Sequence, residues 1–335
     1  MKDKVYVDRE IPRWKANFHI HSTRSDGRQE IGDRIVAYRE AGYNIIMPSD
    51  HNIMWNTDEY DEENFITMRG SEVSPTNRYD NQRFNAGGLW RVCHHLLAIW
   101  DERLDRPCPY AHDERLNKLI SPGITSWNEY TRFWREQGFY MIYCHPRWSK
   151  ASAEHLMAME YCQTVEVYNH ECRIATCTGY SEVEWDYCLS NNKRFYCCAT
   201  DDSHRFVPLP KPELSGGFTM IQAPVLSRVA VSEALDRGDF YASEGGPQIL
   251  DLRVQGGRIQ LQCTPAREVR FVSEPVYHRE ITAREQGVDA IIELEMEIKP
   301  KTLFIRLELI GFDGAKTWSQ PIFPDDLLRD NELGD

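Results

Sequence analysis

The spacing of hydrophobic and polar residues changes along this chain and predicts two regions of different structure. Up to about residue 245, short apolar runs alternate with longer segments in which apolar residues recur every three or four positions. This alternation is typical of repeated strand and helix units, because buried strands are continuously apolar and amphipathic helices repeat about every 3.6 residues. The expected strands span residues 16–21, 43–49, 65–72, 94–100, 139–145, 164–169, 194–200 and 217–223. The expected helices lie near residues 30–42, 125–138, 151–161, 182–193 and 228–238.

A second pattern begins after residue 247. Apolar and polar residues now alternate strictly, with glycine-containing turns between the segments, which span residues 250–263, 267–274, 289–298 and 302–323. Strict alternation predicts antiparallel strands with one buried face. We therefore divide the chain into a larger α/β domain of residues 1–247 and a small, β-rich, sandwich-like domain of residues 248–335.

The composition limits the kinds of molecule that the protein could bind. The chain has 335 residues, 41% of them hydrophobic, which is enough for one large core and a smaller one. Its net charge of −13 repels polyanions, so nucleic acid or an anionic membrane could bind only through a local positive feature. The sequence has no apolar run of about 18 residues and no apolar signal-peptide core, which predicts a cytoplasmic protein.

The number and placement of the cysteines agree with a cytoplasmic protein. The ten cysteines are scattered, form no CxxC pair and in several cases lie inside apolar runs such as residues 195–200. We expect reduced thiols, most of them buried.

The polar segment of residues 74–90 is long for a connection between two expected strands. It is a candidate for a loop or lid over a site, because long connections in compact domains are often functional. A disordered insert is the alternative interpretation.

Side chains that bind metals recur at the ends of the expected strands. His19 and His21 are two residues apart, so they would share one face of a strand, and Asp26 follows in the next turn. In strand and helix barrels the carboxyl ends of the strands meet at one rim, where such side chains would converge. The nine candidate ligands are His19, His21, Asp26, His51, Glu72, His95, His145, Asp202 and His204.

This number of donors predicts more than one ion. Imidazoles and carboxylates hold divalent transition metals, and nine groups exceed the six positions around one ion, so two or three ions are expected. Any one of the histidines alone is explained as well by a surface or core residue bonded to backbone. Three divalent ions against three carboxylates would leave a charge of about +3, or about +2 with a bound hydroxide, which would attract a phosphate monoester.

Seven ordered motifs carry a resemblance to a known family. They are "NFHIHSTRSDG", "PSDHN", "RGSEVS", "HHLL", "CHPRWS", "EVYN" and "TDDSH". Over about residues 16–245 the chain resembles the PHP (polymerase and histidinol phosphatase) family of metal-dependent phosphoesterases. The resemblance implies a distorted (β/α)7 TIM-like barrel with two or three Mn, Fe or Zn ions at the strand ends. It also implies hydrolysis of a small phosphorylated molecule, such as a nucleotide or a sugar phosphate.

The same resemblance assigns the ligands residue by residue. The family's HxH pair corresponds to His19 and His21, its SDG aspartate to Asp26, its DH histidine to His51 and its GxE glutamate to Glu72. Its two later histidines correspond to His95 and His145, and its final DxH pair to Asp202 and His204. Three positions depart from the pattern: the usual DLHxHT opening reads Asn17-Phe18, His94 precedes His95, and Asp201 precedes Asp202. The choices of His95 over His94 and of Asp202 over Asp201 depend on motif spacing alone.

Three further residues are candidates for catalytic roles. A hydroxide held between metal ions could attack phosphorus without a protein nucleophile. Arg147 is our first candidate to bind the phosphoryl oxygens and Arg205 the second, with a surface salt bridge as the alternative for each. Asp50 could orient a metal ligand or pass a proton to the leaving oxygen, and the first role is favoured. Further candidate polar groups of the pocket are Asn52, Tyr168 and Asn169.

Two other classes of function stay open. The same hydroxide would attack a carbonyl or glycosidic carbon, so a hydrolase of an amide, ester or glycoside is the main alternative. Five tryptophans could line a ring or sugar site for it, or pack in the core: Trp55, Trp90, Trp127, Trp134 and Trp148. A nucleic-acid processing module is disfavoured by the charge. The C-terminal domain could cover the barrel, complete the pocket or form a homo-oligomer contact.

Overall fold

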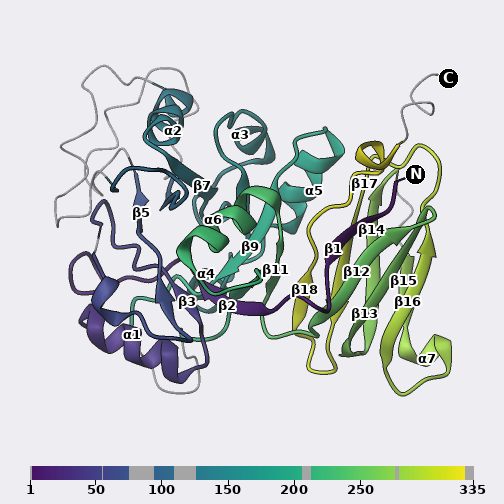
Figure 1. Cartoon of the computed structure of the whole chain (residues 1–335). Helices are drawn as coiled ribbons and strands as arrows, with labels where there is room; N and C mark the ends of the chain where they lie inside the picture. Colours follow the sequence, from purple (N-terminus) through teal and green to yellow (C-terminus); the bar gives the residue numbers. More distant parts are fainter. Residues whose placement is uncertain are drawn as a thin grey trace.

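The computed structural model describes residues 2–54, 56–74, 94–108, 126–205, 213–275 and 279–328 (Figure 1). It is a mixed α/β fold in which a lobe of strands and helices lies beside a lobe of antiparallel strands (Figure 1). Within the described residues the strands form one sheet of nine, one of five and one of four.

The mixed lobe contains part of the nine-stranded sheet and all of the five-stranded sheet. The first includes β2 (Arg13–Asn17), β3 (Ile45–Ile46), β4 (Ile66–Thr67), β10 (Phe218–Gln222) and β11 (Phe240–Ser243). The second is formed by β5 (Gly70–Val73), β6 (Leu96–Trp100), β7 (Phe139–Tyr143), β8 (Thr164–Asn169) and β9 (Tyr196–Thr200). The strand expected at residues 65–72 is therefore divided between β4 in one sheet and β5 in the other.

Isolated bridges link both edges of the five-stranded sheet to the nine-stranded sheet. His51 pairs with Glu72, and Ile20 pairs with Ser203, both in parallel. The first bridge joins the segment after β3 to β5, and the second joins the segment after β2 to the segment after β9. The carboxyl ends of strands from both sheets are thus held next to each other.

Helices cover the outside of this lobe (Figure 1). They are α1 (Ile31–Glu40), α2 (Trp127–Glu136), α3 (Ala153–Met157), α4 (His170–Thr176), α5 (Glu182–Ser190) and α6 (Arg228–Arg237), with a short 3₁₀ turn at Asp58–Tyr60. The five expected helices are confirmed, and a capping box of Ser126 and Glu129 begins α2. The sequence pattern missed α4, because this seven-residue helix buries Cys172 alone and so carries no apolar periodicity.

The second lobe is built from antiparallel strands, as the alternation after residue 247 predicted. One sheet holds β1 (Lys4–Val7), β12 (Ile249–Gln255), β13 (Arg258–Ala266) and β16 (Ile291–Glu297). The other strands are β14 (Glu268–Glu274), β15 (Arg279–Thr282), β17 (Phe304–Ile310) and β18 (Lys316–Trp318), accompanied by α7 (Ala283–Gln286) and a 3₁₀ turn at Pro324–Leu327. Apolar side chains from both sheets, including Leu252, Leu261, Phe271 and Leu307, form one buried cluster.

The two lobes share structure across the expected boundary at residue 247. Strand β1 comes from the start of the chain but pairs with β12, and β18 pairs with both β17 and β11. The buried guanidinium of Arg306 on β17 also bonds both carboxylate oxygens of Asp186 on α5. The division at residue 247 stays a prediction, and the pairing places residues 4–7 with the C-terminal strands.

The sequence also predicts free, mostly buried cysteines and no membrane-spanning segment. The nine described cysteines are all unpaired, and all but Cys177 are buried, which confirms the prediction of free and mostly buried thiols. No helix in the described ranges combines the length and the apolar character needed to span a membrane. Cys93 and most of the segment at residues 74–90 lie outside the described residues.

Candidate metal centre

The nine candidate ligands come together at one end of the mixed-lobe strands. It is the amino end of β6, which runs antiparallel to its neighbours β5 and β7, and the carboxyl end of the other strands that carry ligands. His19 and His21 follow β2, His51 follows β3, Glu72 lies in β5 and His145 follows β7. Asp26 lies in the turn after His21, His95 directly precedes β6, and Asp202 and His204 follow β9. The strand expected at residues 16–21 ends early, at Asn17, because the chain beyond it pairs only through Ile20.

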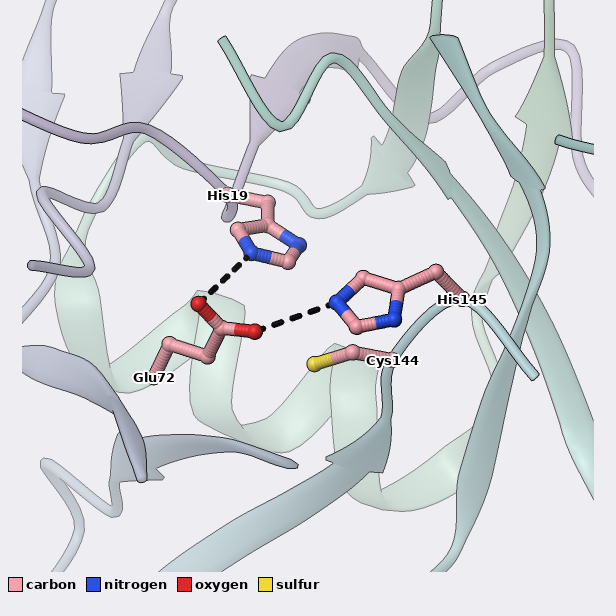
Figure 2. Close-up of side chains that lie close together, drawn as sticks. All are labelled: His19, Glu72, Cys144 and His145. Atoms are coloured by element: carbon pink, nitrogen blue, oxygen red, sulfur yellow. Dashed lines mark hydrogen bonds and ion pairs between the residues drawn. The ribbon is translucent and has the colours of Figure 1, made fainter. Parts of the chain in front are cut away.

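Glu72 lies at the middle of this cluster and is 1% exposed. Its Oε2 atom lies 3.3 Å from His19 Nε2, 3.2 Å from His21 Nε2 and 2.9 Å from His51 Nδ1. Its Oε1 atom lies 2.6 Å from His95 Nδ1 and 3.2 Å from His145 Nε2. Figure 2 shows Glu72 reaching between His19 and His145. One carboxylate therefore faces five imidazoles.

Two other carboxylates complete the cluster. Asp202 Oδ1 lies 3.1 Å from both His19 Nε2 and His21 Nε2. Asp26 lies 3.5 Å from His51 Nε2 and 3.5 Å from His204 Nε2. The cluster thus contains overlapping groups around Asp202, Glu72 and Asp26.

Several nitrogen and oxygen atoms in these groups are arranged so that they could bind a cation together. His19 Nε2, His21 Nε2, Glu72 Oε2 and Asp202 Oδ1 are buried and face one another, yet they make no hydrogen bond to any residue that the structure describes. Buried polar atoms nearly always have hydrogen-bond partners, so this set needs another way to be satisfied. A divalent ion bound by imidazole nitrogen and carboxylate oxygen would supply it.

The electrostatics of the groups agree with this interpretation. Burial alone would raise the pKa of Glu72, but the imidazoles that face it hold its pKa well below the usual range. Burial also disfavours charge on His51 and His204, yet the neighbouring carboxylates raise the pKa of His51 to about 10 and that of His204 to about 9. The carboxylates thus attract positive charge strongly, and a metal ion would take the place of those protons.

Sequence reasoning missed Glu166, a buried carboxylate in β8 that supports the candidate ligands. Its Oε1 atom lies 2.7 Å from His19 Nδ1 and accepts a hydrogen bond from Thr200. Its Oε2 atom accepts from the backbone N–H of His145 at 2.8 Å and from Asn169 at 3.0 Å. The bond to Nδ1 sets the ring orientation and turns His19 Nε2 towards the other ligands. A lone Glu between two valines of a short apolar strand was the available signal.

The structure separates the rival ligands from the cluster. His94 contacts the Tyr143 hydroxyl and packs its ring 4.7 Å from that of Trp127, whereas its neighbour His95 faces Glu72. Burial and two nearby imidazoles lower the pKa of His94 to about 3.

Asp201, the rival of Asp202, makes its hydrogen bonds outside the cluster. It accepts hydrogen bonds from the backbone of Ser215, Gly216 and Gly217 and from the hydroxyls of Tyr38 and Tyr43. These contacts tie the segment that carries Asp202 to β10 and α1.

The three candidate catalytic residues lie around the cluster in different settings. Asp50 is fully buried and accepts hydrogen bonds from Ser22 and Ser25, so it holds the turn that carries Asp26. Arg147 is 41% exposed and pairs with Glu184. Arg205 is 44% exposed and pairs with Glu213. Both arginines make the surface ion pairs that were the alternative interpretation, and their catalytic roles stay predictions.

The other candidate polar groups of the pocket, Asn52, Tyr168 and Asn169, make the following contacts. Asn169 bonds Glu166 and Asp202, and Asn52 accepts from the backbone of Ser74. Tyr168 bonds His170 and stacks on Trp318.

The tryptophans divide between core and rim. Trp127 and Trp134 are buried in the core, whereas Trp148 is half-buried and packs against the rings of His95 and His145. Trp55 and Trp90 lie outside the described residues.

Comparison with solved structures identifies the fold. No family model matches the sequence, and no curated protein matches it. The structure is similar to a two-domain protein from Bacteroides vulgatus that contains a predicted PHP-like metal-dependent phosphoesterase. The match covers 96% of this chain and 98% of that one, at a TM-score of 0.50 and 18% identity. The chain shares the fold of that two-domain protein. This likeness supports the resemblance carried by the sequence motifs and extends over both lobes.

Two further solved structures overlap less. A protein described as a metal-dependent phosphoesterase from Bifidobacterium adolescentis matches 58% of this chain and 89% of its own, at a TM-score of 0.37 and 16% identity. An amidohydrolase from Chromobacterium violaceum, with bound sulfate and no metal, matches 67% of this chain and 96% of its own, at a TM-score of 0.36 and 12% identity.

Proposed function

We propose that this protein is a metal-dependent phosphoesterase that hydrolyses a phosphate ester of a small molecule. The observation that carries the proposal is the meeting of nine imidazoles and carboxylates, Glu72 at their centre, with buried nitrogen and oxygen atoms that make no hydrogen bond within the described residues. The bridges from both edges of the five-stranded sheet to the nine-stranded sheet support a distorted (β/α)7 TIM-like barrel, with this cluster at its rim.

The contacts suggest which side chains would hold each ion. Asp202 and Glu72 would share a first ion with His19 and His21, Glu72 would share a second with His95 and His145, and Asp26 would hold a third with His51 and His204. When bound, Mn, Fe or Zn ions lower the pKa of a water molecule and stabilise charge on phosphoryl oxygens.

The charge balance favours a phosphate ester over a neutral substrate. Three divalent ions against the three ligand carboxylates and Glu166 would leave the site at about +2, which suits a dianion. The protein around it carries a net charge of −13, so a compact anion would be drawn to this site and not to the rest of the surface. Arg147 and Arg205 would help only after exchanging their carboxylate partners for the substrate.

One observation favours the alternative of a non-phosphate substrate. The half-buried ring of Trp148 lies 4.8 Å from that of His145 and 5.7 Å from that of His95, at the edge of the cluster. An indole beside a metal ligand suits a flat or ring-shaped group. A hydrolase of an amide, ester or glycoside would use the same cluster with this surface as its binding face.

Metal removal tests the proposal. Protein treated with a chelator is expected to lose all hydrolysis of a panel of nucleotides, sugar phosphates and an aryl phosphate, and Mn²⁺, Fe²⁺ or Zn²⁺ to restore phosphate release. Phosphate is measured directly, and the same samples are offered amide, ester and glycoside substrates. Cleavage of one of those with every phosphate ester left intact would contradict the phosphoesterase and support the alternative.

A further inference from the structure

The thiol of Cys144 lies among the candidate ligands, although no motif assigns it there. Its Sγ atom, a nitrogen of His19, a nitrogen of His145 and an oxygen of Glu72 all lie within 4.8 Å of one another. All four side chains are buried, and Figure 2 shows the sulfur directed into the space beside Glu72 and His145.

The backbone explains why two neighbouring residues face the same place. Side chains at consecutive positions of a strand point to opposite sides, so Cys144 and His145 could not meet in a continued β7. The strand ends at Tyr143, and His145 has a φ angle of 29°, a left-handed value that is uncommon for a residue other than glycine. The bond from the His145 N–H to Glu166 holds this conformation. Strained backbone of this kind is concentrated at functional sites.

The other members of the group point to a ligand independently of the thiol. His19 Nε2 and Glu72 Oε2 are buried without hydrogen bonds, as described above. The thiol itself has only a long contact of 4.0 Å to the Ile142 carbonyl. Two imidazoles, one carboxylate and one thiol make four donors, the number that tetrahedral Zn²⁺ sites use.

We propose that Cys144 is a sulfur ligand that completes a four-donor site with His19, Glu72 and His145. In this site His19 binds the same ion as His145, instead of the ion that it would otherwise share with His21 and Asp202. The inference rests on the proposed metal centre and specifies which metals that centre prefers. On binding, the sulfur–metal bond forms as the S–H bond breaks and its proton passes to solvent. Because thiolate is a soft ligand, this site selects Zn²⁺, Co²⁺ or Fe²⁺ over Mn²⁺.

Spectroscopy of the metal-loaded chain tests this without measuring activity. Full-length protein is stripped of metal and loaded with Zn²⁺ or with Co²⁺ alone. X-ray absorption at the zinc edge is expected to show a sulfur neighbour at about 2.3 Å beside nitrogen and oxygen at about 2.0–2.1 Å. The Co²⁺ form is expected to show a sulfur-to-cobalt charge-transfer band in the near ultraviolet.

Variants assign the sulfur. Cys144→Ser is expected to lose both signals and to lose its preference for Zn²⁺ over Mn²⁺. The matched control is Cys198→Ser, since Cys198 is 1% exposed and belongs to the same apolar cluster as Cys144 but to none of the candidate ligand groups found in the described ranges. Cys172→Ser tests the rival thiol, which lies with Glu171 and Asp202.

The results distinguish a failure of the Cys144 inference from a failure of the proposed function. Wild-type protein that binds Zn²⁺ with nitrogen and oxygen neighbours alone would overturn the inference, and this result needs no variant to fold. A sulfur signal that survives in Cys144→Ser and disappears in Cys172→Ser would overturn it as well. Sulfur-bound metal in a protein that cleaves no phosphate ester would support Cys144 and contradict only the proposed function.

Discussion

Glu72→Gln is expected to remove most of the bound metal and to lower kcat/KM for a phosphate ester by about 1000-fold or more. Glu72 is the one carboxylate that faces five imidazoles, and it belongs to two of the three proposed ion sites. An amide of the same size keeps the packing but loses the charge. Metal ions contribute several kcal/mol to stabilising a phosphoryl transition state, which corresponds to a loss of this size.

The measurement pairs metal analysis with kinetics. The control is Glu268→Gln, which removes another buried carboxylate, 5% exposed, from β14 in the other lobe, where it pairs with Arg270. That variant is expected to keep wild-type metal content and rate. Glu72→Gln with full metal content and an unchanged rate would contradict the central position given to this residue.

Glu166→Gln is expected to weaken metal binding by about 10–100-fold, although Glu166 is not among the candidate ligands. The carboxylate accepts four hydrogen bonds, from His19, Thr200, the His145 backbone and Asn169. Glutamine offers one acceptor oxygen instead of two, so His19 and the His145 backbone cannot both keep their partner. Glu166 is thus a positioning residue, and its loss should affect the ions held by His19 and His145 first.

Titration of the metal-free variant with Zn²⁺ or Mn²⁺ measures this effect. The site formed by Asp26, His51 and His204 should keep its ion, because Glu166 makes no bond to those residues in the described contacts. Denaturant unfolding in chelator separates positioning from a general loss of stability. A variant that is less stable but binds every ion with wild-type affinity would show that Glu166 is only structural.

The candidate ligands could be found from sequence because strand ends follow simple rules. Most of them lie at or just beyond an apolar run, and parallel strands bring their carboxyl ends to one edge. The exceptions are Asp26, in the turn after His21, and His95, at the start of the antiparallel strand β6. The choice between adjacent residues could not be made from spacing: His94 and Asp201 differ from His95 and Asp202 only in which way the chain turns. Asp202 has a φ angle of 52°, a backbone conformation that no strand pattern predicts.

Other features depend on contacts between distant parts of the chain. Strand β1 is four residues long and pairs with β12, so its position follows from packing and not from its own pattern. Glu166 reads as the polar position of an alternating strand, but Val165 and Val167 on either side of it are also fully buried. A strand buried on both faces can carry a carboxylate only within a hydrogen-bonded network, and the partners of that network come from three other segments.

The most direct test of the central claim is anomalous diffraction from crystals grown with Mn²⁺, Fe²⁺ or Zn²⁺, recorded at the absorption edge of each metal. The account predicts two or three anomalous peaks, each within bonding distance of the groups built around Asp202, Glu72 and Asp26. Crystals that contain the metal but show no peak among these nine side chains would contradict it.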